Sequence, residues 1–185
     1  MMTRLQDLYN KTYRNELMKE LGLDNVMAVP TITKIVINSG VGEAVNNSNA
    51  IEEMAEILER ISGQKPVINK AKKAISAFKI REGLEIGVSV TLRGAKMWQF
   101  FDKLVNVVFP RTKDFRGVNP NAFDGAGNYS IGITEHTVFP EIDPNKVQKI
   151  RPLQLTIVTN TRSNEYARAL LNKFGFPFKK DGNKS

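Results

Sequence analysis

Residues 86–93 read Ile-Gly-Val-Ser-Val-Thr-Leu-Arg, in which apolar and polar residues alternate. Successive side chains of a β-strand point to opposite faces of the sheet. The even-numbered residues are apolar and are predicted to face a core: Ile86, Val88, Val90 and Leu92. The polar odd-numbered residues are predicted to face away: Ser89, Thr91 and Arg93. One apolar face and one polar face favour an antiparallel or mixed sheet that is covered on one side only.

A second strand with the same period follows Pro30, over residues 31–38. One predicted face carries Thr33, Ile35 and Ile37. The other carries Ile32, Lys34, Val36 and Asn38. If both strands belong to one sheet, their polar faces form a platform of hydrogen-bonding groups with one or two cations. Such a platform suits folded RNA, although the pattern fits a merely solvated sheet face equally well.

Helical periodicity surrounds these strands. Helices are predicted over residues 3–21 before Gly22, over 51–61 with Asn49 and Glu52 as a capping pair, from Gly94 to Val108 before Pro110, and from the N-cap Ser163 to Gly175. Further short strands are predicted at 64–69, 74–81, 128–134 and 152–160. With no linker composition and no internal repeat, the chain is predicted to form a single α+β domain over residues 1–179, followed by a disordered tail at 180–185.

Residues 111–127 contain no periodic pattern. A loop of this length in a compact domain is usually functional or disordered. It begins with three cations around one aromatic residue: Arg111, Lys113, Phe115 and Arg116.

Between Arg60 and Arg81 the chain carries seven basic residues and no acidic one. The basic residues are Arg60, Lys65, Lys70, Lys72, Lys73, Lys79 and Arg81. Apolar residues, among them Phe78, lie between them. A phosphate backbone suits such a surface, because each neutralised phosphate releases counterions. Taken alone, the segment could equally be an exposed lysine-rich hairpin.

The overall charge favours a polyanionic partner. Lys and Arg number 27 against 19 Asp and Glu, which gives a net charge of +8 and a pI near 9.7. Nucleic acid is the first candidate partner, and an anionic membrane surface is the second. Residues 1–20 contain no apolar signal core, and no apolar stretch is long enough to span a bilayer. We therefore expect a soluble, cytoplasmic protein without a membrane partner.

Catalysis and cofactor binding find little support. The absence of cysteine excludes disulfides and thiolate chemistry. The single histidine, His136, has no partner for catalysis or metal binding and is expected to be structural or exposed. Gly40-Val-Gly42 lacks the third glycine of a dinucleotide fingerprint, because position 45 is Val45. The sequence predicts no enzyme, no metal site and no cofactor.

Six motifs resemble the family of bacterial large-subunit ribosomal protein five, over Leu5 to about Lys179. They are Pro30-Thr-Ile-Thr-Lys-Ile-Val-Ile-Asn38 leading into Gly40-Val-Gly-Glu43, Ser62-Gly-Gln-Lys-Pro66, Phe78-Lys-Ile-Arg-Glu-Gly83, Val90-Thr-Leu-Arg-Gly94, Pro110-Arg-Thr-Lys-Asp-Phe-Arg-Gly117 and Phe123-Asp-Gly-Ala-Gly-Asn128.

The resemblance implies a structural protein of the large subunit that binds 5S rRNA in the central protuberance. By position, the residues facing 5S rRNA would be Lys34, Asn38, Gln64, Phe78, Thr91 and Arg93. Lys70, Lys72 and Lys73 would approach tRNA in the peptidyl site. The loop carrying Arg111, Lys113, Phe115 and Arg116 would form an intersubunit bridge with small-subunit head protein thirteen. 23S rRNA and other 5S-binding ribosomal proteins are further implied partners. Both loops are expected to be mobile in the free protein.

Two other functions remain as alternatives. An RNA chaperone or single-strand binder would present several aromatic residues on its sheet, whereas the predicted open faces carry Asn, Thr, Ser and Lys. A phosphate-handling enzyme would need a cluster of acid–base groups, which the lone His136 does not supply.

Overall fold

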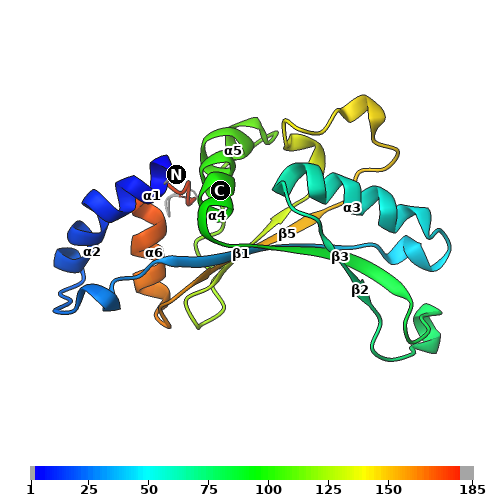
Figure 1. The fold of residues 1–185 in the computed structure, drawn as a ribbon, viewed down its shortest axis with the longest axis horizontal. Helices are drawn as coiled ribbons and strands as arrows, with labels where there is room; N and C mark the ends of the chain where they lie inside the picture. The colour runs from blue at the N-terminus through cyan, green and yellow to red at the C-terminus, as the bar shows by residue number, and fades with distance from the viewer. Residues whose placement is uncertain (1–2, 180–185) are drawn as a thin grey trace, which may run out of the picture. The chain divides into compact units, whose positions relative to one another are not determined.

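The computed structural model describes residues 3–179, in which five strands form one sheet in the order β2-β3-β1-β5-β4 (Figure 1). The strands are β1 (Ile32–Gly40), β2 (Val67–Lys70), β3 (Glu85–Leu92), β4 (Tyr129–Ile133) and β5 (Leu153–Thr159). β2 pairs with β3 in antiparallel register. β1 and β5 also run antiparallel, since Thr31 contacts Asn160 while Ser39 contacts Pro152. The predicted α+β class with an antiparallel sheet is confirmed.

The predicted helices are present, with two corrections at their ends. They are α1 (Arg4–Leu8), α2 (Arg14–Glu20), α3 (Asn49–Ser62), α4 (Gly94–Lys103), α5 (Phe109–Arg111) and α6 (Asn164–Lys173). Wider π-helical turns connect α1 to α2 and α4 to α5. Pro110 does not stop the helix as predicted, because it lies in the first turn of α5, where its missing N–H is not needed.

Contacts within the chain define two compact units. Unit 1 comprises Met1–Ile35, Arg93–Ile131 and Thr156–Ser185, and unit 2 comprises Val36–Leu92 and Gly132–Leu155. The predicted tail, residues 180–185, lies outside the described residues. The extent predicted for a single domain, residues 1–179, stays a prediction.

Unit 1 is built on a cluster of aromatic side chains. Phe174 lies at the end of α6 and packs against Tyr9, Trp98 and Phe101, with ring centroids 5.4–6.1 Å apart. The Tyr9 hydroxyl donates a hydrogen bond to the carbonyl of Pro30 at 2.9 Å, which ties the N-terminal helix to the start of β1. The predicted N-cap of α6 is confirmed, since the Ser163 hydroxyl accepts from the amide of Tyr166.

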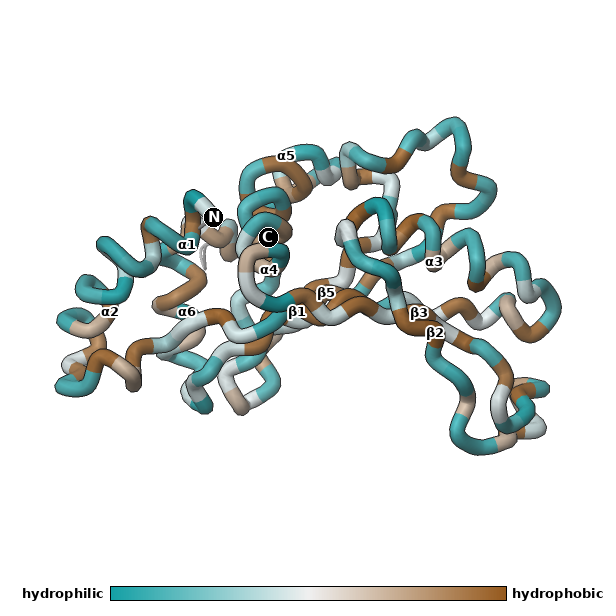
Figure 2. The backbone as a smooth tube through the Cα atoms, viewed as in Figure 1, coloured by the Kyte–Doolittle hydropathy of each residue, from teal (hydrophilic) through white to brown (hydrophobic). Residues whose placement is uncertain are grey.

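Unit 2 places α3 against one face of β2 and β3. Polar and apolar residues alternate along α3 (Figure 2). Six of its apolar residues are buried: Ala50, Ile51, Met54, Ile57, Leu58 and Ile61. The predicted capping pair is wrong. The helix already begins at Asn49, and Ser48 occupies the N-cap position without a side-chain hydrogen bond. Asn47 instead accepts from the amide of Asn49, outside the helix.

Alternation predicted β3 better than β1. Val88, Val90 and Leu92 are at most 2% exposed, as predicted. In β1, Ile35 and Ile37 are buried, but Ile32 is buried as well and Thr33 is exposed. The alternation of buried and exposed residues fails at the start of β1, where neither Thr33 nor Lys34 is buried. The exposed Thr33 hydroxyl donates a hydrogen bond to the carbonyl of Val158.

The strand predicted at 74–81 does not form. β2 is followed by a connection that projects away from the sheet (Figure 1). In this connection a single bridge pairs Ile75 with Ile80 around a 3₁₀ turn, Ser76–Phe78. Lys79 has a φ of 55°, and this left-handed conformation closes the turn instead of extending a strand.

Candidate nucleic-acid interface

The open face of unit 2, defined by Asn38, Gln64, Asn69, Ser89 and Thr91, lies opposite the face that α3 covers. On β3, Thr91 is exposed and Ser89 is half-buried, while the intervening Val90 is buried. On β1, Asn38 is half-buried between two buried neighbours. Its side chain has no hydrogen-bond partner among residues 3–179. The face therefore offers polar groups on rigid strands, as the alternation predicts.

Gln64 belongs to this face for a reason that periodicity does not show. It follows α3 and precedes β2, and its carboxamide nitrogen donates to the backbone carbonyl of Thr91 at 3.3 Å. This bond fixes the carboxamide beside Thr91 and leaves its oxygen free to accept from a ligand. Two predicted contact residues are thus brought together.

Asn69 is a polar residue of this face that sequence analysis missed as a contact. Val67 pairs with Ser89 and Asn69 pairs with Gly87 across the two strands. Asn69 is the last residue of the strand predicted at 64–69, and it lies within β2. Its side chain exchanges hydrogen bonds with Ser89, at 3.0 and 3.4 Å. Only the strand register could have revealed this pair.

Phe78 is presented on the tight turn between β2 and β3. Its side chain is 69% exposed. Backbone bonds from Phe78, Lys79 and Ile80 to Ile75 and Ser76 close the turn that carries it. An exposed ring held on a closed turn can stack on a base without a large ordering cost.

The lysines at the end of β2 and on its connection to β3 differ in whether they form an ion pair. Lys70 pairs with Glu85 at 3.6 Å, although both side chains are well exposed. Lys72 and Lys73 are exposed and have no carboxylate partner in the described chain. Because exposed ion pairs of this kind are weak, all three lysines remain available to bind a polyanion.

The cations at unit 1 are of two kinds. Lys34 is half-buried on β1, and Arg93 is exposed at the N-terminus of α4. Arg111, Lys113 and Arg116 are exposed around Phe115, which is half-buried and stacks on Phe109 with centroids 5.3 Å apart. Phe115 therefore holds its loop onto the helix end, and the three cations remain accessible.

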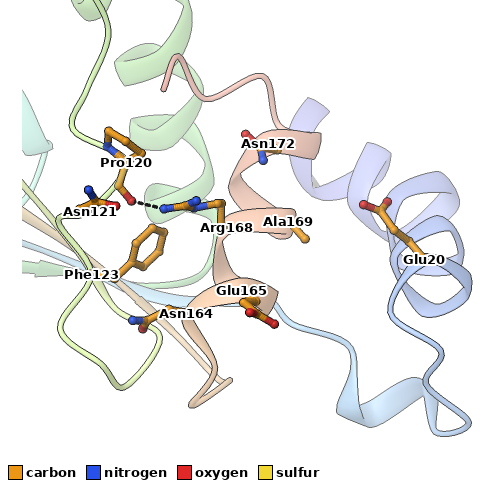
Figure 3. A pocket seen from close by; sticks show the side chains of 9 residues that line it. All are labelled: Glu20, Pro120, Asn121, Phe123, Asn164, Glu165, Arg168, Ala169 and Asn172. Atoms are coloured by element: carbon orange, nitrogen blue, oxygen red, sulfur yellow. Dashed lines mark hydrogen bonds between the residues drawn. The ribbon is translucent and has the colours of Figure 1, made fainter. Parts of the chain in front are cut away.

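A hollow of about 440 Å³ opens between α6, the loop at 120–123 and Glu20 (Figure 3). Arg168 lies in it, but donates to the carbonyl of Pro120 and lies 5.8 Å from the Phe123 ring. The lining includes no histidine, serine or lysine that could act as nucleophile or base. The ionisable residues of its lining are Glu20, Glu165 and Arg168.

His136 is fully buried in unit 2, and its Nδ1 accepts from the amide of Arg151 at 3.1 Å. The Arg151 side chain is 7% exposed and donates to Glu43 at 2.7 Å and to Glu53 at 2.9 Å. Hydrogen bonds from Lys149 and Arg151 lower the pKa of Glu43. Among residues 3–179 no group of three His, Cys, Asp or Glu side chains could hold a metal ion. Arg151 and its partners His136, Glu43 and Glu53 form a structural clamp in unit 2.

Two further pKa shifts have local causes. The hydrogen bond from the Asn128 side chain lowers the pKa of Asp124, and burial raises the pKa of Tyr129 to about 12. Both belong to unit 1 and leave these groups in their usual charge state at neutral pH. None of the described helices is long and apolar enough to cross a membrane.

Comparison with known proteins gives a consistent result over nearly the whole chain. Residues 25–81 match the family described as ribosomal protein L5, and residues 85–178 match the ribosomal L5P family C-terminus. The chain is 51% identical over 179 residues to large ribosomal subunit protein uL5 of Anaeromyxobacter sp. strain Fw109-5, covering 97% of this chain and 99% of that protein. It is 52% identical to uL5 of Thermosipho melanesiensis, covering 95% and 97%, and 53% identical to uL5 of Mesoplasma florum, covering 97% and 100%.

Proposed function

The chain belongs to the ribosomal protein L5 family, and from this premise we propose that it binds 5S rRNA and helps attach that RNA to the central protuberance. As a family member it is a structural, non-enzymatic constituent of the large ribosomal subunit in the cytoplasm.

The observation that carries the proposal is the open face of unit 2. Thr91 is exposed, the Gln64 carboxamide is bonded to its carbonyl, and the Asn38 amide has no partner in the described chain. Neutral donors and acceptors on strands suit folded RNA, which is recognised by its shape and through its phosphates and 2′-hydroxyl groups. We assign 5S contacts to these residues and to Phe78, which can stack on a base. Lys34 and Arg93 are proposed to supply charge.

Two loops are proposed to reach other partners. Lys70, Lys72 and Lys73 would contact tRNA in the peptidyl site, a partner suggested by family membership. Their exposed charges, which strong pairs do not neutralise, are available for it. The cations Arg111, Lys113 and Arg116, held by the stacked Phe115, would contribute to a bridge with small-subunit head protein thirteen. Further contacts with 23S rRNA and other 5S-binding ribosomal proteins are proposed from family membership alone.

Alanine at Asn38 or Thr91 is expected to weaken 5S rRNA binding by about three- to tenfold, the value of one net hydrogen bond. Neither side chain has a hydrogen-bond partner among residues 3–179, so the melting temperature should change little. Filter binding of 5S rRNA and of a tRNA-sized control over a salt series measures the effect. Gln99→Ala, on an exposed position of α4, is the matched control. Binding of both RNAs with the same steep salt dependence would reject recognition by the face.

The loop contacts can be mapped because the chain contains no cysteine. An Fe-chelate tethered at Lys73→Cys in reconstituted subunits is expected to cleave peptidyl-site tRNA, and one at Lys113→Cys to cleave RNA near the small-subunit head. Primer extension and gel analysis locate the cuts. A tether at Asn145→Cys is the control. Cleavage patterns from positions 73 and 113 that match the control would contradict both contacts.

A further inference from the structure

Asn69 and Ser89 form a hydrogen-bonded pair on the open face. The pair can form because the residue of β3 opposite Asn69 has no side chain. Asn69 lies opposite Gly87, which has no side chain. The Asn69 carboxamide can therefore extend diagonally over Gly87 and reach Ser89. A Cβ at position 87 would lie 3.0 Å from the Ser39 carbonyl oxygen, so a side chain there would require the backbone of β1 to shift slightly.

The mutual bonds use only part of the polar capacity of the two side chains. Asn69 Nδ2 donates to Ser89 Oγ at 3.0 Å, and Ser89 Oγ is placed to donate back to Asn69 Oδ1 at 3.4 Å. A carboxamide has two N–H donors and an oxygen with two lone pairs, and a hydroxyl has one donor and two lone pairs. One N–H of Asn69 and one lone pair on each oxygen therefore remain without a partner among residues 3–179.

The pair is accessible and lies next to the residues already assigned to RNA. Both side chains are half-buried, and Val67, which pairs with Ser89, is 64% exposed. Thr91 follows on the same face of β3. The register of β2 shifts between Asn69 and Lys70. Such irregularities re-aim side chains and are common beside binding sites.

We propose that Asn69, oriented by Ser89, recognises one ribose 2′-hydroxyl of the bound RNA, a role that rests on the proposed binding of 5S rRNA by this face. A 2′-hydroxyl is both donor and acceptor. It can accept from the free N–H of Asn69, or it can donate to the remaining lone pair of Asn69 Oδ1 or of Ser89 Oγ. A deoxyribose offers neither group, so the pair selects RNA over DNA at one nucleotide. Because the two side chains already hold each other, little order is lost on binding.

The test is analogue interference with 5S rRNA in which 2′-deoxynucleotides are incorporated at random. Wild-type protein is expected to show interference at a small set of nucleotides. Asn69→Ala should lose the signal at one of them and keep the others, and should bind all-ribose 5S rRNA about three- to tenfold more weakly. Ser89→Thr keeps the hydroxyl and should keep the complete pattern. Asn145→Ala, an exposed asparagine elsewhere in unit 2, is the control.

The outcomes separate this inference from the function on which it rests. Wild-type protein that binds 5S rRNA no better than a control tRNA would overturn the proposed function and the inference with it. Specific binding with the same interference pattern for wild type and Asn69→Ala would overturn the inference alone. So would a folded Asn69→Ala variant that loses every signal, since the pair would then support the whole face and not one hydroxyl. Circular dichroism establishes that the variants are folded.

Discussion

Gly127→Ala is expected to lower the free energy of unfolding by about 3–5 kcal/mol, which for a chain of this size means a melting temperature lower by roughly 10 °C. Gly127 has a φ of +76°, a conformation that costs an alanine about 1–2 kcal/mol. A Cβ there would also overlap the backbone carbonyl of Thr161, which cannot rotate away. Urea unfolding followed by circular dichroism measures the loss.

Two nearby glycines separate the causes of this loss. Gly125 has a φ of +82° but open space around a Cβ, so Gly125→Ala should cost only about 1 kcal/mol. Gly132 has no positive φ and also open space, so Gly132→Ala should be neutral or slightly stabilising. If Gly127→Ala and Gly125→Ala were equally stable, the backbone at Thr161 would be free to move, and the overlap would not explain the effect.

Gly127 shows why the predicted loop at 111–127 was only partly understood from sequence. Its amide donates to the Asn164 side chain at 3.1 Å, and its carbonyl accepts from Thr159 at 2.8 Å. Asp124 accepts from the amides of Ala126 and Asn128, which closes the turn that contains Gly127. The two contacts of Gly127 join residues more than 30 positions apart. Local periodicity carries no information about them, so a segment without pattern was interpreted as a functional or disordered loop.

The sequence predicted best those features that depend on alternation alone. Burial of Val88, Val90 and Leu92 follows from a period of two, and this same period placed Thr91 and Asn38 on the open face. Features that depend on register were out of reach. Two contacts exist only because β2 pairs with β3 at one particular offset. They are the hydrogen bond from Gln64 to the Thr91 carbonyl and the side-chain hydrogen bonds between Asn69 and Ser89. The contact roles of these residues stay predictions until the RNA experiments are done.

The clamp in unit 2 was also invisible in the sequence, because its members are 10 to more than 100 residues apart. Arg151→Met is expected to lower the free energy of unfolding by roughly 3 kcal/mol, since it removes two charge-assisted hydrogen bonds from a nearly buried side chain. The expected loss is moderate for such a group because Glu43 and Glu53 are 30% and 24% exposed and can regain water. Urea unfolding at pH 7 measures it.

Lys149→Met is the matched control for this substitution. Lys149 also contacts Glu43, at 2.7 Å, but its side chain is 63% exposed. Exposed pairs contribute about 0–1 kcal/mol, so the control should lie close to wild type. If Arg151→Met and Lys149→Met lost the same small amount, the buried guanidinium would not be the group that holds the loop at 136–151 to α3.

The dependence on pH gives the clamp a second, independent signature. Hydrogen bonds from Lys149 and Arg151 lower the pKa of Glu43 in the folded protein below its value in the unfolded chain. Such a group contributes stability that is fully present above the unfolded pKa, near about 4.3, and that is lost as the pH falls through the lowered folded pKa. The difference between wild type and Arg151→Met should therefore be constant from pH 7 to about 5 and shrink below that. A difference that stays constant down to pH 3 would mean that Arg151 stabilises the fold by packing its aliphatic stem and not by holding the two carboxylates.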